Sequence, residues 1–364
     1  LYDAPGLPIS WNKNQYQEGK NEYVVVRPEL KKQIEELYRR NPEEARDSFG
    51  EDPFEVKNIL KYWIFSERQE FNVIPTDTIN IHIDKDALLR SGIMLPKTIR
   101  HLKGEDLKDA IPDKLYIPLT DIRMLTKVDL LMLEMLANCN WERPLYLAIS
   151  VGSVSKLKFD NYFVQEGLAF RFTPFDYKKW GDVGENRLYA VDVERLYDNV
   201  MNRYKYGGLD TPGLYLDETT LRTCWYHRRL FAQLAKELIA QGDNERAKKV
   251  LAYAEQVIPG YNVPETHESG SYDIATAYAA LGEKTKAVTL AVHLIAEAED
   301  YINWAFSLKG NRIEMVRNDC IYKFWQWNQY NELLKKIDGE KYKESNRQFE
   351  EKYALFAPTM NYKN

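Results

Sequence analysis

The spacing of apolar residues divides the chain into two parts. In the first part, Ile79, Ile81 and Ile83 alternate with polar residues, and this period of two predicts a half-buried strand. From Val191 onward, every segment repeats its apolar residues at the three-to-four-residue spacing of an amphipathic helix. The pattern therefore predicts an α/β N-terminal domain followed by an all-α domain.

Short strands and helices are expected to alternate in the first part. Strands are predicted at 23–26, 79–83, 114–119 and 145–149, with a hairpin at 162–164 and 168–173. Helices are predicted at 29–39, 53–64, 84–89 and 121–137, the last capped by Thr120 or Asp121. Strand 145–149 is apolar, so we expect it to be buried on both faces. With strand 114–119 and the helix between them, it is expected to form one parallel crossover unit.

A polar, glycine-containing stretch at 176–185 separates the two parts. Exposed polar stretches of this kind commonly mark domain boundaries. We therefore expect a domain at 1–180 with a small mixed or parallel sheet, and a helical domain at 190–364.

The helical part contains a repeat whose equivalent residues lie 40 positions apart. Each unit has a small residue on its first helix, a turn glycine and a small residue on its second helix: Ala235, Gly242 and Ala247, then Ala275, Gly282 and Ala287. This spacing is typical of tetratricopeptide repeats, with Pro259 ending the second helix of the first unit. A generic pair of helical hairpins with coincident alanines stays the alternative. Further helices are predicted at 193–204, 311–329 and 340–353.

Composition narrows the function classes without choosing one. The 364 residues suffice for two domains. The net charge of -5, from 50 basic and 55 acidic residues, gives no basic excess for phosphates, so we expect no nucleic-acid partner. The densest apolar stretch, 130–137, carries Glu134 and is far shorter than the roughly 20 residues of a membrane span. The chain begins with Leu1 rather than Met, so we expect a processed or excised piece.

Cysteine and histidine give no metal or redox motif. The three cysteines lack a Cys-x-x-Cys pair and are expected to be small buried hydrophobic residues: Cys139, Cys224 and Cys320. The five histidines show no helical metal spacing. Glu265, His267 and Glu268 cluster in one loop, which we interpret as a solvated polar linker rather than a metal site. We therefore expect no metal, no cofactor and no catalytic residue.

Two groups of residues are candidates for binding. Gly152 and Ser153 follow the last strand of the expected crossover unit, where α/β folds place ligands. Trp304, Trp325 and Trp327 lie in an aromatic-rich C-terminal region. Exposed rings there would stack on sugar or peptide, and the alternative is that they form the core between helices.

Three groups of residues carry a family resemblance. They are Val-Ile-Pro-Thr-Asp-Thr at 73–78 with Asp-Lys-Asp at 84–86 and Ser-Gly-Ile at 91–93, Asn-Cys-Asn-Trp-Glu-Arg-Pro-Leu-Tyr at 138–146, and Asp-Glu-Thr at 217–219. The chain resembles the soluble C-terminal region of a family of Bacteroidetes membrane proteins. The multi-span N-terminal region of that family is a domain of unknown function similar to the membrane part of protein O-mannosyltransferases. The resemblance implies a sugar-transfer site in the membrane region, so no catalytic residue is carried over to this chain.

These observations lead to three functional hypotheses. The first is a non-catalytic accessory domain on the periplasmic side of the inner membrane, tethered through the missing membrane region, whose repeats bind a polypeptide acceptor or protein partner. The second is a stand-alone glycan-binding protein of the cell envelope that uses exposed aromatic rings. The third is a cryptic glycoside hydrolase with carboxylates converging at the ends of the α/β strands.

Overall fold

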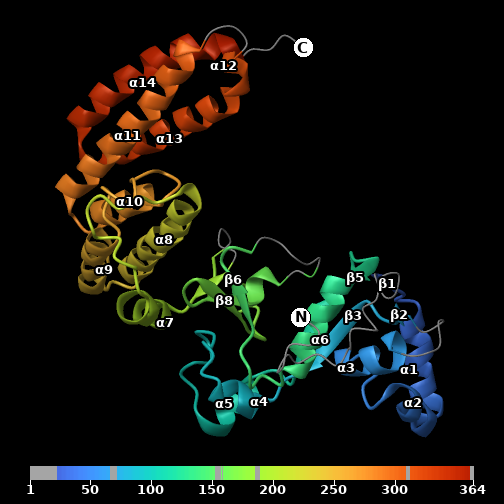
Figure 1. Ribbon diagram of the computed structural model, residues 1–364. Helices are drawn as coiled ribbons and strands as arrows, with labels where there is room; N and C mark the ends of the chain where they lie inside the picture. Colours follow the sequence, from blue (N-terminus) through green and yellow to red (C-terminus); the bar gives the residue numbers. More distant parts are fainter. Residues whose placement is uncertain are drawn as a thin grey trace. The chain divides into compact units, whose positions relative to one another are not determined.

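The computed structural model describes residues 23–65, 72–151, 157, 159–184, 189–308 and 312–360. It divides into two compact units, Leu1–Asp192 and Val193–Asn364, which we call the α/β unit and the helical unit (Figure 1). The α/β unit combines short strands with helices, and the helical unit contains only helices among its described elements. The predicted α/β region followed by an all-α region is therefore confirmed.

The described strands of the α/β unit form three small sheets, ordered β2-β1-β5, β3-β4 and β6-β8-β7-β9. The strands are β1 (Tyr23–Val26), β2 (Val73–Ile74), β3 (Thr78–His82), β4 (Lys114–Pro118), β5 (Met124–Thr126), β6 (Tyr146–Ala148), β7 (Phe163–Gln165), β8 (Ala169–Phe172) and β9 (Ala190–Val191). The helices are α1 (Leu30–Arg40), α2 (Pro42–Phe49), α3 (Val56–Ile59), α4 (Lys85–Arg90), α5 (Gly104–Ala110) and α6 (Lys127–Asn138), with a π-helical turn at Leu60–Ile64 and a 3-10 turn at Asp160–Tyr162.

The isoleucines of the predicted alternation lie in the core of the α/β unit, but Asn80 between two of them is buried as well, so the strand does not alternate strictly. Strand β3 pairs antiparallel with β4, so that Ile79 faces Ile117 and Ile81 faces Leu115. All four side chains are buried. Strand β1 pairs parallel with β2 and antiparallel with β5, and the predicted hairpin forms from β7 and β8. Apolar strand faces packed under helices therefore explain why this unit folds.

The predicted crossover unit is wrong. Strand β4 pairs with β3, whereas β6 pairs with β8 in a different sheet. Strand β6 lies at the edge of its sheet, with Tyr146 exposed and Leu147 only partly buried, instead of being covered on both faces. A short apolar run shows the same pattern in an edge strand and in a central one, so periodicity could not separate the two.

Helix α6 also begins later than predicted. Thr126 caps it through a capping box in which the Asp129 carboxylate accepts a hydrogen bond from the Thr126 N–H, at 2.8 Å. Leu125, which fits the helical apolar spacing, instead lies in β5 and faces Val24 of β1. Pairing with β1 thus overrides the helical pattern before Thr126.

The described part of the polar stretch between the two parts of the sequence, up to residue 184, belongs to the α/β unit. Phe175 and Tyr177 are fully buried, and the Tyr177 hydroxyl donates to the carbonyl oxygen of Met94. Asp182 accepts hydrogen bonds from the Lys97 N–H. The α/β unit consequently extends to Asp192.

The helical unit is built from helices of between 4 and 24 residues. They are α7 (Val193–Asp198), α8 (Glu218–Ala240), α9 (Asn244–Val257), α10 (Ser271–Ala280), α11 (Lys284–Ser307), α12 (Arg312–Met315), α13 (Arg317–Ile337) and α14 (Gly339–Met360), with a π-helical turn at Asn199–Arg203. Helix α8 packs on α9, α10 on α11 and α13 on α14, and further contacts join α8 to α10 and α11 to α13. Successive hairpins therefore share a continuous core.

The 40-residue repeat is visible in the backbone of two hairpins. The Asp243 N–H donates to Leu238 O and the Glu283 N–H to Tyr278 O, both at 2.9 Å. Both turn glycines have positive φ, 80° at Gly242 and 77° at Gly282, a conformation that glycine adopts without strain. The four repeat alanines are fully buried where the helices approach closely: Ala235, Ala247, Ala275 and Ala287. Pro259 follows the end of α9, as the sequence predicted.

Candidate functional site

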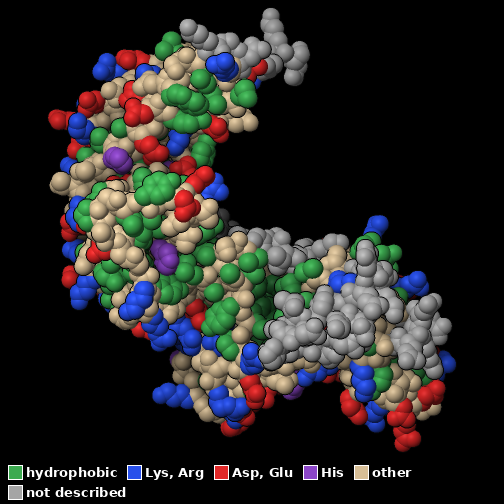
Figure 2. Space-filling model, viewed as in Figure 1, with side chains coloured by type: hydrophobic (Ala, Val, Ile, Leu, Met, Phe, Trp, Pro, Cys, Tyr) green, Lys and Arg blue, Asp and Glu red, His purple; other side chains and the backbone are tan. Residues whose placement is uncertain are grey.

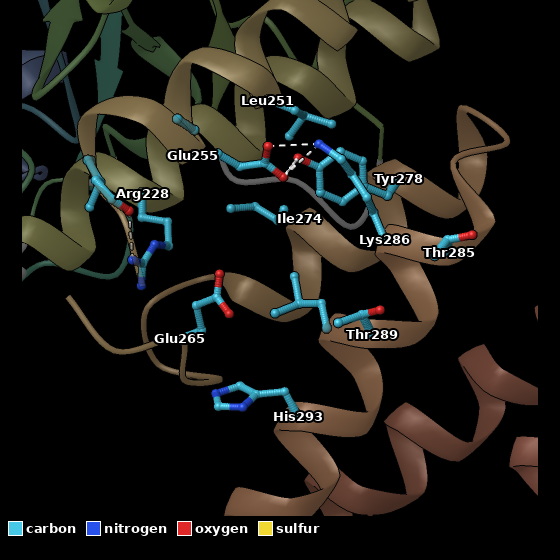
Figure 3. Close-up of a pocket in the computed structure, with 13 residues that line it drawn as sticks. Arg228, Leu251, Glu255, Glu265, Ile274, Tyr278, Thr285, Lys286, Thr289 and His293 are labelled. Atoms are coloured by element: carbon cyan, nitrogen blue, oxygen red, sulfur yellow. Dashed lines mark hydrogen bonds and ion pairs between the residues drawn. The ribbon is translucent and has the colours of Figure 1, made fainter. Parts of the chain in front are cut away.

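A pocket of about 330 Å³ lies between the two repeated hairpins of the helical unit (Figure 3). Helices α9, α10 and α11 form its walls, and the loop between α9 and α10 closes one side. Leu251, Ile274 and Leu290 give it apolar surface, and Thr289 adds a hydroxyl. Its volume lies at the small end of the range for ligand sites.

One wall of the pocket carries a completed ion pair. The Lys286 ammonium lies 2.7 and 2.9 Å from the two carboxylate oxygens of Glu255. The Tyr278 hydroxyl donates to the same carboxylate, and Lys286 lies 5.0 Å from the centre of the Tyr278 ring. Burial raises the pKa of Tyr278, so the phenol keeps its proton. Glu255 and Lys286 therefore satisfy each other.

Arg228, from α8, lies at the base of the pocket and holds the loop. Its guanidinium donates to the carbonyl oxygens of Ile258, Val263 and Pro264 and to the hydroxyl of Ser269. Burial lowers the pKa of Arg228 to about 10, although a nearby glutamate, Glu265, favours its charged form. The hydrogen bonds to loop oxygens compensate the buried cation.

Glu265 and His293 are the ionisable groups of the pocket that remain available. Glu265 reaches the pocket from the loop and His293 from α11 (Figure 3). Neither takes part in the hydrogen bonds or ion pairs found among the described residues. The Glu265 side chain packs on Gly260, where an added Cβ would approach its Cδ to 3.2 Å. The loop thus positions a carboxylate whose hydrogen-bonding capacity is unused.

The same loop places His267 in an aromatic cluster. Its Nδ1 lies 2.9 Å from the Tyr330 hydroxyl, its ring stacks on Tyr272, and Tyr322 and Trp325 meet it edge-on. Burial lowers the pKa of His267, so the neutral ring predominates at neutral pH. The interpretation of this loop as a solvated linker is therefore wrong, because Arg228 and the aromatic cluster hold it from both sides.

Two glutamates beside the cluster share one cation. Lys323 lies 4.0 Å from Glu268 and 3.6 Å from Glu297. Burial would raise the pKa of Glu268, but hydrogen bonds, including one from Gln326, and Lys323 outweigh it and lower that pKa. At Glu297 burial dominates and raises the pKa. The arrangement is an ion-paired group rather than two facing acids with water between them.

The predicted tryptophans divide between surface and core. Trp325 and Trp304 are each 49% exposed. Trp325 stacks on Tyr322 with the ring planes 11° apart, whereas Trp304 contacts Tyr301. Trp327 is fully buried and its indole N–H donates to the Ser345 hydroxyl at 2.8 Å, so it has no surface with which to bind a ligand. Of the three, only Trp325 belongs to the aromatic cluster.

The other predicted binding residues, Gly152 and Ser153, lie outside the described residues. Sequence reasoning missed Glu265 and His293 as one site. The two are 28 positions apart and come from a loop and a helix, so no local spacing joins them. The sequence feature that could have indicated this site is the segment between the two repeat units, since an insertion between repeats commonly lies on a binding face.

The α/β unit holds a polar pocket of about 210 Å³ where two of the strings that carry the resemblance meet. The Trp141 indole N–H donates to His82 O at 2.7 Å, and Asn140 accepts from Lys57 at 2.9 Å. Asn140 and Trp141 both have positive φ, 48° and 62°. These contacts give the string at 138–146 a structural role.

Several classes of site find no support in the described ranges. There, no group of three or more histidine, cysteine, aspartate or glutamate side chains is close enough to hold a metal ion. None of the helices described combines the length and apolar character needed to cross a bilayer. The cysteines are free and buried, as predicted: Cys139, Cys224 and Cys320. On the face shown in Figure 2, acidic and basic side chains of the helical unit are mixed rather than gathered by sign.

Comparison with known proteins identifies the first half of the chain. A family model described as TMEM260-associated domain 2 matches residues 1–194. The match covers the α/β unit and ends close to the boundary of the helical unit. No curated protein and no solved structure matches the chain.

Proposed function

The chain belongs to the family of the TMEM260-associated domain 2, and from this premise we propose that it is a non-catalytic accessory domain of a membrane glycosyltransferase-like protein. The helical unit, as a tetratricopeptide-like stack, binds a polypeptide acceptor or a protein partner. The α/β unit connects that stack to the membrane region of the parent protein. The working compartment is the periplasmic side of the inner membrane.

The observation that carries this proposal is the partly exposed aromatic cluster on α13. Trp325 and Tyr322 expose 49% and 44% of their surface, although large aromatic side chains gain free energy by burial. Tryptophan and tyrosine are the residues that most often dominate polypeptide interfaces, because they bury a large area with few rotatable bonds. Stacked helical hairpins present such residues along one extended surface.

Glycan binding is the second candidate, and one observation favours it. The rings of Trp325 and Tyr322 are nearly parallel and stacked, with centroids 5.6 Å apart, so each ring has one flat face turned away from the other. Flat aromatic faces suit the apolar face of a sugar ring. The hydrolase hypothesis has no comparable observation, because Lys323 lies within 4.0 Å of each carboxylate of the ion-paired group.

A peptide array that tiles envelope proteins of the source organism tests the proposal with the whole chain. Binding is measured for the natural chain, for Trp325→Ala and for Trp304→Ala. Trp304 is the matched control, because it is equally exposed but contacts Tyr301 instead of the cluster. We expect Trp325→Ala to weaken binding about 10-fold or more, as aromatic hot spots contribute about 2 kcal/mol.

The outcomes separate the candidates. Equal binding by Trp325→Ala and the natural chain would remove the cluster as the polypeptide site. Quenching of tryptophan fluorescence by oligosaccharides, lost in Trp325→Ala and kept in Trp304→Ala, would favour the glycan-binding alternative. The accessory role is tested separately: deleting the domain from the full-length protein should reduce transfer to polypeptide acceptors, and unchanged transfer would contradict that role.

A further inference from the structure

The pocket between α9, α10 and α11 differs from the aromatic cluster in its chemistry, because it combines apolar walls with one unengaged carboxylate. We infer that it binds an alkyl-borne cation, the side chain of a lysine or arginine in the polypeptide that the helical unit holds. The identity of the carrier rests on the proposed function. The affinity of the pocket for the cation does not.

The charges of the pocket support a cationic occupant. The Arg228 guanidinium donates hydrogen bonds to three carbonyl oxygens and a serine hydroxyl, and Lys286 is paired with Glu255 at 2.7 Å. Glu265 is the carboxylate of the pocket that has no hydrogen bond or ion pair among the described residues. A cation bound there would donate hydrogen bonds to Glu265, whereas an anion would find the donors of Arg228 and Lys286 already engaged.

The walls of the pocket suit the alkyl part of such a side chain. Ile274 and Leu290 are at least nine-tenths buried and contribute apolar surface between the helices. Lysine and arginine commonly lay their methylene groups along apolar surface while the charged end reaches a polar partner. The volume of about 330 Å³ accommodates one long side chain rather than a folded segment.

The position of Glu265 is built into the fold. Arg228 fixes the loop through the backbone oxygens of Ile258 and Pro264, and Gly260 leaves the space in which the Glu265 side chain packs. Asn262 adds two hydrogen bonds, to Leu209 O at 2.7 Å and Thr211 O at 2.6 Å. A carboxylate held this way loses little conformational freedom when it binds a cation, which favours affinity.

The test uses small probes, so that it does not depend on finding the polypeptide. The full chain with labelled isoleucine and leucine methyl groups is titrated with Nα-acetyl-lysine methylamide, the arginine analogue and the uncharged norleucine analogue. We expect saturable shifts at Ile274 and Leu290 with either cation, and binding about 10-fold weaker for norleucine. The relative affinities of the two cations distinguish an ammonium site from a guanidinium site.

Two variants assign the effect to one carboxylate. Glu265→Gln should weaken binding of the cationic probes about 10-fold, whereas Glu245→Gln, on α9 outside the pocket, should leave it unchanged. Equal affinity for lysine and norleucine analogues, absence of shifts at Ile274 and Leu290, or full binding by Glu265→Gln would each overturn the inference. Polypeptide binding that needs Trp325 would survive all three results, so failure here is distinct from failure of the proposed function.

Discussion

Each unit holds a pocket lined by polar side chains, and different contacts characterise the two pockets. In the polar pocket of the α/β unit, Trp141 is bonded to His82 and Lys57 to Asn140. In the pocket of the helical unit, Glu265 is left without a hydrogen bond or ion pair among the described residues. The strings which carry the family resemblance therefore have a structural role in the α/β unit, whereas Glu265 of the helical unit stays available to a ligand.

The units also differ in the distance that their stabilising contacts span along the chain. In the α/β unit, β1 pairs with β2 and β5, segments about 50 and 100 residues away. In the helical unit, each long helix packs on its neighbour in sequence. Local changes in the helical unit should therefore affect one hairpin, and those in the α/β unit a whole sheet.

The largest effect on stability is expected from replacing a buried tryptophan of the helical unit rather than an exposed one. Trp327→Ala should lower the free energy of unfolding by about 3–5 kcal/mol, because it empties a fully buried site and leaves Ser345 without its donor. Trp325→Ala, two residues away and half exposed, should cost less than about 1 kcal/mol. Chemical denaturation of both variants measures the difference, and equal costs would contradict the division of the tryptophans.

The next largest effect on stability is expected from replacing Arg228, whose guanidinium holds the loop between α9 and α10. Arg228→Met should destabilise the helical unit by about 3 kcal/mol, because several buried carbonyl oxygens lose their donor at about 1–3 kcal/mol each. Arg222→Ala, an exposed i,i+4 partner of Glu218 on the same helix, is the control and should cost less than about 0.5 kcal/mol. Hydrogen exchange should localise the loss to 258–270, and an unchanged exchange rate there would refute the role.

A smaller effect is expected where the backbone of the α/β unit is unusual. Asn140 has φ 48°, so Asn140→Ala should cost about 1 kcal/mol more than Asn140→Gly. Both variants lose the hydrogen bond to Lys57, so their difference isolates the backbone. Thermal unfolding gives the comparison, and a glycine variant no more stable than the alanine variant would argue against the positive φ.

The smallest effect concerns acid. Burial lowers the pKa of His227 and His267 in the helical unit, so the unfolded chain takes up protons first as the pH falls below about 6.5. Stability of this unit should therefore decline from that pH downward, by at most about 1 kcal/mol for each half-buried ring. Segment-resolved hydrogen exchange at about pH 7.5 and about pH 5.5, on either side of the ordinary histidine pKa, would measure this decline in stability. Stability that rose on acidification would contradict the expected direction.

In the α/β unit, carboxylates are expected to cause a loss of stability at a lower pH than in the helical unit. A hydrogen bond from Lys31 lowers the pKa of Asp77, and at Asp52 burial is outweighed by hydrogen bonds from Lys114 and the Phe54 N–H, so its pKa is lowered too. The stability that these groups contribute is present above about pH 4 and is lost as the pH falls through their lowered pKa values. Loss of stability in both units at the same pH would contradict this expected difference between the units.

Sequence patterns predicted the parts of the fold that depend on local periodicity. The burial of Ile79, the turn glycines Gly242 and Gly282, and the buried repeat alanines all follow from a few neighbouring residues. The position of β6 at a sheet edge depends on pairing with β8, which no local pattern encodes. The same limit applies to the pocket, because Glu265 and His293 line one space only once the loop, α10 and α11 have packed together.

We propose that the helical unit, and not the α/β unit, holds the polypeptide. Hydrogen exchange of the full chain, with and without the tightest peptide from the array, tests it most directly. We expect slower exchange in α10, the loop before it and α13, with unchanged exchange in β1 to β9. Protection confined to the strands of the α/β unit would contradict the account and move the binding site to the family domain.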